Sequence, residues 1–431
     1  MSLLLHTFPN DPPTENIVSG SGAYLMTQDG KRYLDMTSGA TSCCILGYAH
    51  PEVTAAIKAQ VDQISYIDYK AWLDPNREAL AELLLSRAEH GLDRVFFTGQ
   101  SGSESCEAAM KLSYQAHQDS GRTEKSWFIA REQSYHGATL HSMVLSDRPN
   151  LQFFHKLFPG NCVKIPQHHP NYRMRPGETL ADYAERSARE LEDKILEIGP
   201  EKVCAFIAET IMGGLVGNVP PAPGYWQHIR RVCDRYNVHL IMDEVYCGTG
   251  TSGKIYCCDW DGVTPDFIML GKTMGAGYIP LSAVVTSQRI EQAIAAGQGR
   301  VGYSSTHQGH ALGVAAALAV QRVIHRDETL DHVQKLGRHM SGAIEAGLGD
   351  HPFFVEVRGR GLRFAVEHKT PDNHRFGTQM QQSLKEQHGI LVDGKWHRVA
   401  FAPPFITTMA QADEVVDRFV TTFKALASSL F

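Results

Sequence analysis

The sequence predicts an α/β fold in which helices cover both faces of a mostly parallel sheet. From about residue 75 to residue 286, short continuous apolar runs alternate with helix-like segments. Strands that are apolar along their whole length are typical of parallel sheets buried on both faces. The 431 residues suffice for a large domain and a smaller partner, because domains usually contain roughly 100–200 residues. The tail predicts this partner, an α+β unit packed with the N-terminal segment.

The first expected elements are a hairpin over 22–36, whose strand-like runs flank an Asp-Gly turn, and a helix over Pro51–Tyr66. Apolar residues at helical spacing then predict further helices. These are Arg77–Arg87, Glu104–His117, Ala181–Ile198, Tyr225–Tyr236, a long helix that begins with Val314–His325, and a last one near Ala410–Leu426. The apolar runs predict strands at Arg94–Thr98, Trp127–Ala130, Val203–Ala208, His239–Met242, Phe267–Leu270 and Leu281–Thr286.

Composition and charge exclude several classes of protein. The formal net charge of −6 and the lack of a basic stripe argue against a nucleic-acid partner. No stretch approaches the roughly 18 apolar residues that span a bilayer, and the N-terminus lacks a secretory signal, so no membrane partner is expected. The nine cysteines show neither zinc nor disulfide-scaffold spacing. We therefore expect a cytoplasmic protein with reduced thiols and no metal site.

Small or polar residues follow each expected strand. Parallel sheets bind ligands beyond the carboxyl ends of their strands, so residues at this one edge should meet. They are Ser101-Gly102-Ser103, "REQSYHGAT" after Ala130, Glu209, Asp243-Glu244 and Gly271-Lys272. Each could be an ordinary turn, but their recurrence on one edge favours a ligand site.

The loop Ser101-Gly102-Ser103 offers small side chains, free backbone N–H groups and a helix N-terminus, a combination that binds phosphate. An ordinary helix start with Ser103 as its N-cap is the alternative. A P-loop is not expected, because Ile255 follows "GTGTSGK" where Ser or Thr is needed. "GKT" likewise has Asp266 in place of the first glycine.

Lys272 and Asp243 both end apolar strands at this edge. A lysine after a strand is usually a surface charge, but a lysine, a carboxylate and a phosphate loop have a joint explanation in pyridoxal phosphate. Its aldehyde bonds to a lysine, its ring nitrogen needs a carboxylate, and its phosphate needs backbone donors. Glu244, on the other side of the strand, is expected to be structural.

With these residues, the chain resembles the class III (ω-) aminotransferases, which are fold type I pyridoxal-phosphate enzymes. The resembling segments include "TGQSGSESCEAAMK", "YHG", "AET", "PPAPGYWQHIRRVCDRYNVHLIMDEVYCGTG", "PDFIMLGKTMGAGYIPLSAV", "STHQGHALGVAAALAV" and "VRGRGL". The resemblance implies a large domain with a seven-stranded type of sheet over 61–309. A small domain would be built from both termini, over 1–60 and 310–431.

The resemblance also implies roles for individual residues. Lys272 would form the Schiff base and move protons, and Asp243 would pair with the ring nitrogen. The other cofactor contacts would be Ser101, Gly102 and Ser103 at the phosphate, Tyr135 and Val245 on the two ring faces, His136 and Gly137 beside Tyr135, and Glu209 near the ring hydroxyl. Thr306 would reach the phosphate of the neighbouring subunit, because the family is dimeric.

The substrate side departs from the family. Many members bind a carboxylate with an arginine near the "PP" of the tail, where this chain has Ala400. Arg398 faces the same side of an extended strand and could replace it, or could be a solvated arginine. Gly214 stands where members with that arginine often have glutamate, and Thr251 stands where arginine is usual. Wall residues would include Tyr48 and Trp72, with Tyr66 and Tyr69.

The expected function is transfer of an amino group from an amine or non-α amino acid to a keto acid. Lys272 would move the proton at the substrate Cα. One alternative is an ammonia-lyase or phospho-lyase acting on a phosphorylated or phosphonate-bearing amine, with Lys395, His397 and Arg398 facing the anionic group. A second alternative is an inactive relative that serves as a binding subunit, against which the intact Lys272 and Asp243 argue.

Overall fold

The larger part of the molecule is built on a seven-stranded sheet. The structure, a computed structural model, describes residues 3–157, 160–371 and 373–430. The strands of this sheet are β4 (Arg94–Phe97), β5 (Trp127–Arg131), β6 (Cys162–Ile165), β7 (Val203–Glu209), β8 (His239–Asp243), β9 (Phe267–Leu270) and β10 (Ala283–Thr286). Their order is β4-β10-β9-β8-β7-β5-β6, and β10 alone runs antiparallel to its neighbours. The predicted mostly parallel sheet is confirmed.

The sequence did not predict β6, which lies at one edge of this sheet. Its run of four residues contains Lys164, and only Ile165 is buried. An edge strand has a neighbour on one side alone, so it needs no continuous apolar run. Its sequence therefore lacks the signal by which the central strands were found.

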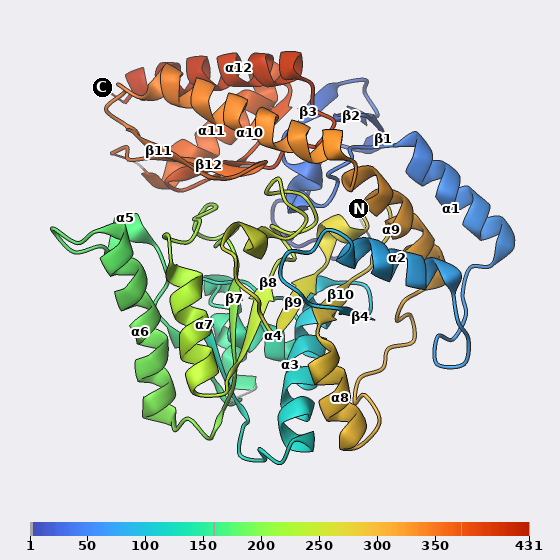
Figure 1. Cartoon of the computed structure of the whole chain (residues 1–431). Helices are drawn as coiled ribbons and strands as arrows, with labels where there is room; N and C mark the ends of the chain where they lie inside the picture. The colour runs from blue at the N-terminus through green and yellow to red at the C-terminus, as the bar shows by residue number, and fades with distance from the viewer. Residues whose placement is uncertain (1–2, 158–159, 372, 431) are drawn as a thin grey trace.

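Helices pack around the large sheet (Figure 1). They are α3 (Gly102–Asp119), α4 (Leu140–Leu145), α5 (Pro170–Arg173), α6 (Leu180–Ile198), α7 (Tyr225–Arg235) and α8 (Gln288–Ala296). The predicted helices among them begin and end within a few residues of their expected limits. The sequence did not predict α8, which packs on α3 and buries only Ile290 and Ile294.

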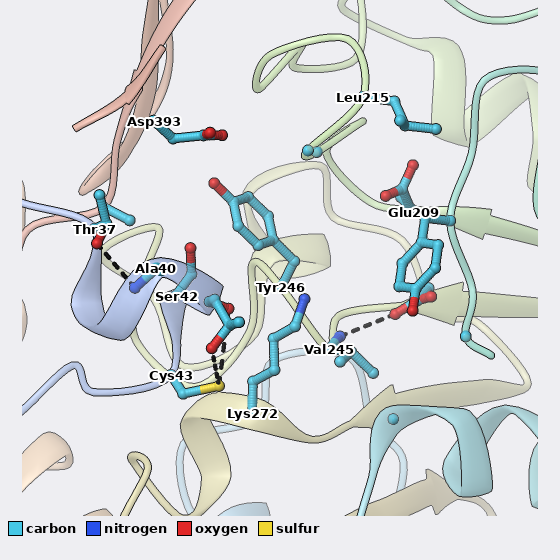
Figure 2. A pocket seen from close by; sticks show the side chains of 18 of the residues that line it. Thr37, Ala40, Ser42, Cys43, Glu209, Leu215, Val245, Tyr246, Lys272 and Asp393 are labelled. Atoms are coloured by element: carbon cyan, nitrogen blue, oxygen red, sulfur yellow. Dashed lines mark hydrogen bonds between the residues drawn. The ribbon is translucent and has the colours of Figure 1, made fainter. Parts of the chain in front are cut away.

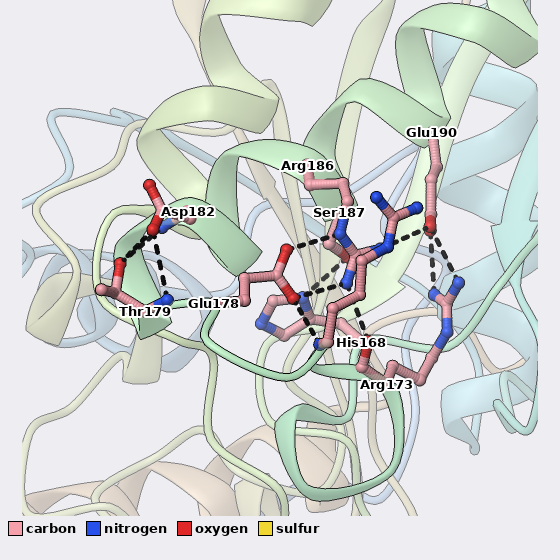
Figure 3. Close-up of polar contacts among 9 residues, drawn as sticks. His168, Arg173, Glu178, Thr179, Asp182, Arg186, Ser187 and Glu190 are labelled. Atoms are coloured by element: carbon pink, nitrogen blue, oxygen red, sulfur yellow. Dashed lines mark hydrogen bonds and ion pairs between the residues drawn. The ribbon is translucent and has the colours of Figure 1, made fainter.

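Polar contacts fasten the start of α6 to the preceding chain (Figure 3). Thr179 is the N-cap of α6, and its hydroxyl accepts the backbone N–H of Asp182 at 3.2 Å. Arg173 forms a two-pronged ion pair with Glu190 at 2.9 and 2.8 Å. His168 bonds Ser187 of the same helix at 2.9 Å. These groups satisfy one another, so we assign them a structural role.

The smaller body contains segments from both ends of the chain. One sheet joins β1 (Ile17–Ser21), β2 (Tyr24–Thr27), β3 (Arg32–Asp35) and β13 (Ile390–Leu391), and another joins β11 (Phe354–Arg360), β12 (Arg363–His368), β15 (Arg398–Phe401) and β14 (Asp393–Lys395). Its helices are α10 (Asp327–Leu348), α11 (Asn373–His388) and α12 (Met409–Ser428). β3 and β13 pair in parallel, with Leu34 opposite Ile390. The predicted association of the two termini is confirmed, and the limits 1–60, 61–309 and 310–431 stay predictions.

Three helices, α1 (Pro51–Gln63), α2 (Pro75–Leu85) and α9 (Ala311–Ile324), pack together beside the two bodies. Short helical turns complete the fold: η1 (Ser38–Ser42), η2 (Pro149–Leu157), η3 (Cys257–Trp260) and η4 (Lys272–Met274). Within the described ranges, no helix combines the length and apolar character needed to cross a bilayer.

The centre of the large sheet positions the polar residues that end its strands. β7 and β8 are buried along their whole lengths. Their parallel register places Glu209 directly opposite Asp243. β9 leads through Gly271 into η4, which begins with Lys272. The expected cluster of strand ends therefore forms at one edge of the sheet.

Candidate active site

A cavity of about 570 Å³ lies beyond the carboxyl ends of β7 and β8 (Figure 2). The larger body lines it with strand ends and loops, and the smaller body lines it with η1 and the β14–β15 hairpin. Among its lining residues are the predicted Ser101, Gly102, Ser103, Tyr135, His136, Gly137, Glu209, Asp243, Val245, Lys272 and Arg398. The structure thus brings all the predicted cofactor residues together except Thr306.

Asp243 is 4% exposed and is held by two neighbours. The ring Nδ1–H of His136 donates to its Oδ2 at 2.8 Å. The backbone N–H of Val245 donates to its Oδ1 at 3.0 Å. Hydrogen bonds to both oxygens fix the carboxylate at the floor of the cavity. The other ring nitrogen of His136, Nε2, is buried without a partner among the described residues.

Glu244 faces away from the cavity, as expected. Its carboxylate accepts the backbone N–H groups of Cys257 and Cys258, both at 2.7 Å, and the hydroxyl of Thr210 at 3.1 Å. Three donors on a fully buried carboxylate tie the end of β8 to η3. Glu244 is therefore part of the scaffold that holds Asp243 in place.

Lys272 extends into the cavity toward the ring of Tyr246 (Figure 2). Its Nζ lies 5.3 Å from the centroid of that ring. Burial lowers the pKa of Lys272, and the charge of Asp243 opposes this effect. In the described part of the chain, Nζ has no hydrogen-bond acceptor. A lowered pKa and a free amine suit Lys272 to attack a carbonyl carbon.

The start of α3 supplies backbone donors to the same cavity. The helix begins at Gly102 and Ser101 is its N-cap, so the alternative with Ser103 as N-cap is wrong. The Ser103 hydroxyl instead accepts the backbone N–H of Ala138 at 3.0 Å. Across the described ranges, the N–H groups of Gly102 and Ser103 have no acceptor, as expected for a first helical turn. They are available to an anion at the positive end of the helix.

Glu209 lies beside Asp243 at the end of β7 and is buried. Burial is the main cause that raises the pKa of Glu209 from 4.5 to about 7, and the charge of His136 opposes it. The folded chain therefore holds a proton on Glu209 at pH values where the unfolded chain has lost it. This contribution to stability is present below about pH 4.5 and is lost as the pH rises through about 7.

We expect Glu209→Gln to remove the loss of stability that titration of Glu209 causes in the ligand-free protein as the pH rises. The difference in unfolding free energy between wild type and variant should change by up to about 3 kcal/mol from pH 5 to pH 8. Denaturant titrations of both proteins at the two pH values measure it. If the unfolding free energies of wild type and variant changed equally between pH 5 and pH 8, Glu209 would not titrate as described.

The structure adds cavity residues that the sequence did not indicate. These are mainly Thr37, Ser42 and Cys43 of the η1 segment, Tyr246, and Asp393 of β14. The sequence did not indicate Tyr246, because strand alternation would point its side chain to the face opposite that of Val245. However, β8 ends at Asp243 and the chain turns, so both side chains line the cavity. The glycines of "CGTG" were the signal that alternation stops there.

Arg398 is a buried residue of the cavity wall. Its side chain is 1% exposed, so the alternative of a solvated arginine is wrong. Its Nη1 donates to Oδ2 of Asp393 at 3.2 Å, and its Nη2 donates to the carbonyl of Gly214. Ala400 lines the cavity from the same strand. Arg398 therefore stands on the cavity wall with an internal carboxylate beside it.

Five residues expected on the substrate side do not line the cavity of their own chain, and their roles stay predictions. His397 does not line the cavity; its ring lies 6.0 Å from that of Tyr172, because it faces the other side of the hairpin. Tyr48 lies outside and donates to Asp35 at 2.7 Å. Trp72 also lies outside the cavity and is 67% exposed. Tyr66 and Tyr69 likewise lie outside it.

Comparison with known proteins gives a consistent result. A family model described as aminotransferase class-III matches residues 9–423. An uncharacterised aminotransferase of Schizosaccharomyces pombe is 34% identical over 99% of this chain and 96% of its own length. Gamma aminobutyrate transaminase 2 of Solanum lycopersicum is 32% identical over 95% of this chain and 91% of its own. The PMP-bound form of a Vibrio fluvialis aminotransferase superimposes with a TM-score of 0.90 and 29% identity, covering 97% of this chain and 94% of that one.

Proposed function

The chain belongs to the class III aminotransferase family, which uses pyridoxal 5′-phosphate, and we propose that it moves an amino group from an amine or non-α amino acid to a keto acid. One observation carries the proposal. A single cavity holds Lys272 and Asp243 at its floor and the pair Asp393–Arg398 on its substrate side. The floor suits the cofactor, and the arginine on the substrate side, Arg398, already has an internal carboxylate partner.

The residues present fit the cofactor. Backbone N–H groups of Gly102 and Ser103 are free for its phosphate, and the buried carboxylate of Asp243 is oriented for a protonated ring nitrogen. Gly102 leaves room that no other residue would, since a Cβ there would lie 2.5 Å from Cγ1 of Val245. Tyr135 and Val245 line the cavity as candidate contacts of the two ring faces.

Each residue then has a defined task. When bound, pyridoxal phosphate supplies an aldehyde that reacts with amines and a ring that accepts electrons from the substrate carbon. Asp243 keeps the ring nitrogen protonated, and His136 and Val245 keep Asp243 in position. Lys272 would hold the cofactor through its Nζ, and the same Nζ would take the proton from the substrate Cα and return a proton.

We expect Gly102→Ala to weaken cofactor binding about tenfold. The new methyl group displaces Val245 from the cavity wall, and such overpacking commonly costs about 1–3 kcal/mol. Titration of apoenzyme with pyridoxal phosphate measures the effect. Gly342→Ala is the control, because nothing lies within 4 Å of the added Cβ and it is remote from the cavity. Equal affinities in the two variants would remove Gly102 from the cofactor site.

We further propose a homodimer in which Thr306 reaches the partner's cofactor. Thr306 is exposed and lies outside the cavity of its own chain. Its carbonyl accepts the hydroxyl of Tyr66 at 2.9 Å, which holds the segment against the loop that carries the exposed Trp72 and Leu73. These apolar side chains suit a surface covered by a second copy.

A mixture of two inactive variants tests the dimer. Lys272→Ala and Thr306→Asp should each be inactive alone, because one lacks the amine and the other repels the partner's phosphate. A hybrid dimer has one site with intact Lys272 and intact Thr306, so activity should return on mixing. A mixture that stays inactive, with hybrids demonstrated by light scattering and mass spectrometry, would contradict the assignment of Thr306.

A screen of amino donors tests the proposed reaction. Purified enzyme is incubated with amines and ω-amino acids, with and without pyruvate or 2-oxoglutarate, while amino-acid product, ammonia and phosphate are followed. Transamination predicts turnover only with a keto acid. Release of ammonia or phosphate without a keto acid would support the lyase alternative instead.

A further inference from the structure

We propose that Arg363 is a positioning residue for Lys272. It holds the ring of Tyr246 against the amine of Lys272, and its unpaired positive charge behind that ring favours the neutral, reactive form of the amine. Arg363 is not among the residues that line the cavity, so it acts through Tyr246, which is. The inference rests on the proposed function, in which the amine of Lys272 bonds to the cofactor.

Arg363, the first residue of β12, is a fully buried arginine whose contacts are all with neutral groups. Its Nε donates to the carbonyl of Tyr246 at 3.1 Å, and its Nη2 donates to the carbonyl of Ser42 at 3.0 Å. Over the described ranges, no carboxylate lies within 4 Å of it. Arg360, on the paired strand, instead has a two-pronged ion pair with Asp261 at 2.7 and 2.9 Å. A buried charge is costly without a partner of opposite sign, so the charge of Arg363 acts strongly on its neighbours.

The ring of Tyr246 is shared by two basic side chains. Cζ of Arg363 lies 5.0 Å from its centroid, and Nζ of Lys272 lies 5.3 Å from the same centroid. The face of an aromatic ring attracts cations, so Tyr246 binds Arg363 through its ring as well as its carbonyl. Two positive charges this close repel each other. A guanidinium keeps its proton, whereas an ammonium can lose one, so the repulsion acts on the protonation of Lys272.

Several elements bring titratable or charged groups toward the amine of Lys272. These groups are Glu209 of β7, Asp243 of β8, His136, Cys43, Tyr246 and Arg363. The β14–β15 hairpin adds the internally neutral pair Asp393–Arg398. Burial is the main cause that lowers the pKa of Lys272; the carboxylates of Asp243 and Glu209 oppose it, and the charge of Arg363 acts in the same direction as burial. Arg363 therefore offsets part of the attraction that the two carboxylates exert on a proton at Nζ.

The contact with Ser42 keeps Arg363 in one place. The φ angle of Ser42 is 62°, in the left-handed region that residues other than glycine seldom adopt. Asp35 holds the first part of this η1 segment, since its Oδ2 accepts the backbone N–H of Gly39 at 2.6 Å. Arg363 holds the last part at the Ser42 carbonyl. Its guanidinium thus joins η1 of the smaller body to Tyr246 of the larger body, beside Lys272.

Acetylation of Lys272 in the full chain without cofactor tests the effect of the charge. Acetic anhydride reacts with neutral amines, so the pH at which the peptide containing Lys272 becomes acetylated, read by mass spectrometry, reports the protonation of Nζ. Arg363→Gln keeps a hydrogen-bond donor and loses the charge. At a pH below the wild-type midpoint, its acetylation at Lys272 should therefore be slower by about threefold or more. Arg363→Lys keeps the charge and should restore the wild-type rate.

Arg360→Gln is the matched control. Arg360 lies opposite Arg363 in the register of β11 and β12, its charge is balanced by Asp261, and it lies outside the cavity. The change also removes one arginine from the hairpin, but Lys272 should become acetylated as in wild type. If Arg363→Gln fails to fold, Arg363→Met takes its place, because it keeps an apolar stem in the buried site and also lacks the charge.

The holoenzyme gives a second readout that a purely structural role would not move. Its visible absorbance changes with pH as the nitrogen that joins Lys272 to the cofactor gains a proton. The midpoint of this change should move to higher pH in Arg363→Gln and return in Arg363→Lys. Unchanged acetylation of Lys272 in Arg363→Gln, or an equal change in Arg363→Lys or Arg360→Gln, would overturn the inference. Failure of every amino donor in wild type would refute the proposed reaction alone, because acetylation needs no turnover.

Discussion

Lys272→Ala is expected to lower the rate of amino transfer by at least about a thousandfold. In the proposed function, the variant loses the amine that holds the cofactor and the group that moves the proton at the substrate carbon. A positioned acid–base group alone contributes about 10²–10⁴-fold. Lys272 is the lysine that extends into the cavity from the end of β9, and burial lowers its pKa. Turnover and covalent attachment are both measured. Borohydride reduction of the wild-type holoenzyme should leave the cofactor's mass on the peptide that contains Lys272.

Lys254→Ala is the matched control. Lys254 belongs to "GTGTSGK", lies outside the cavity, and pairs with Glu89 at 2.8 Å. Its loss should leave both turnover and cofactor attachment unchanged. A cofactor mass on any other peptide of the wild-type protein, or full activity in Lys272→Ala, would refute the assignment of Lys272.

Asp243→Asn is expected to lower turnover by at least about a hundredfold with little change in shape. The amide keeps the size of the carboxylate and loses its charge, so the ring nitrogen is no longer kept protonated and the ring is a weaker electron acceptor. Hydrogen bonds from His136 and Val245 hold this carboxylate in the cavity floor. The half-reaction with an amine donor, followed by stopped flow, reports the loss directly.

Glu244→Gln gives the opposite pattern from the adjacent position. Its carboxylate accepts two backbone N–H groups and a hydroxyl. An amide at this position would direct its own N–H group toward one of these donors. We expect this variant to unfold at a lower temperature while each folded molecule keeps its activity. If Asp243→Asn lost stability and Glu244→Gln lost turnover, the roles of the two carboxylates would have to be exchanged.

The sequence predicted which strand ends would meet at the floor of the cavity, for a physical reason. Glu209, Asp243 and Lys272 each follow a continuous apolar strand, and parallel strands bring such ends to one edge. The buried interior makes those strands conspicuous in the sequence. The edge strand β6 and the short helix α8 bury few residues, so they left no comparable pattern.

The substrate side could not be predicted in the same way, because it depends on contacts between distant segments. Alternation along β15 placed Arg398 on the face of Ala400, which the structure bears out. It could not indicate that the Gly214 carbonyl and Asp393 would hold that side chain. Tyr48 and Trp72 were chosen as aromatic residues near the N-terminal part of the site, and neither lines the cavity. Aromatic type alone does not locate a pocket wall.

The pairing of β3 with β13 has a consequence for synthesis of the chain. Leu34 leaves the ribosome long before its partner Ile390 has been made. Until then, the edge of β3 has unpaired backbone groups, which are a template for association with other chains. The seven strands of the large sheet lie between these two residues and can fold first. Closing the smaller body is thus a late, long-range step, and the open edge of β3 is exposed to association with other chains until that step is complete.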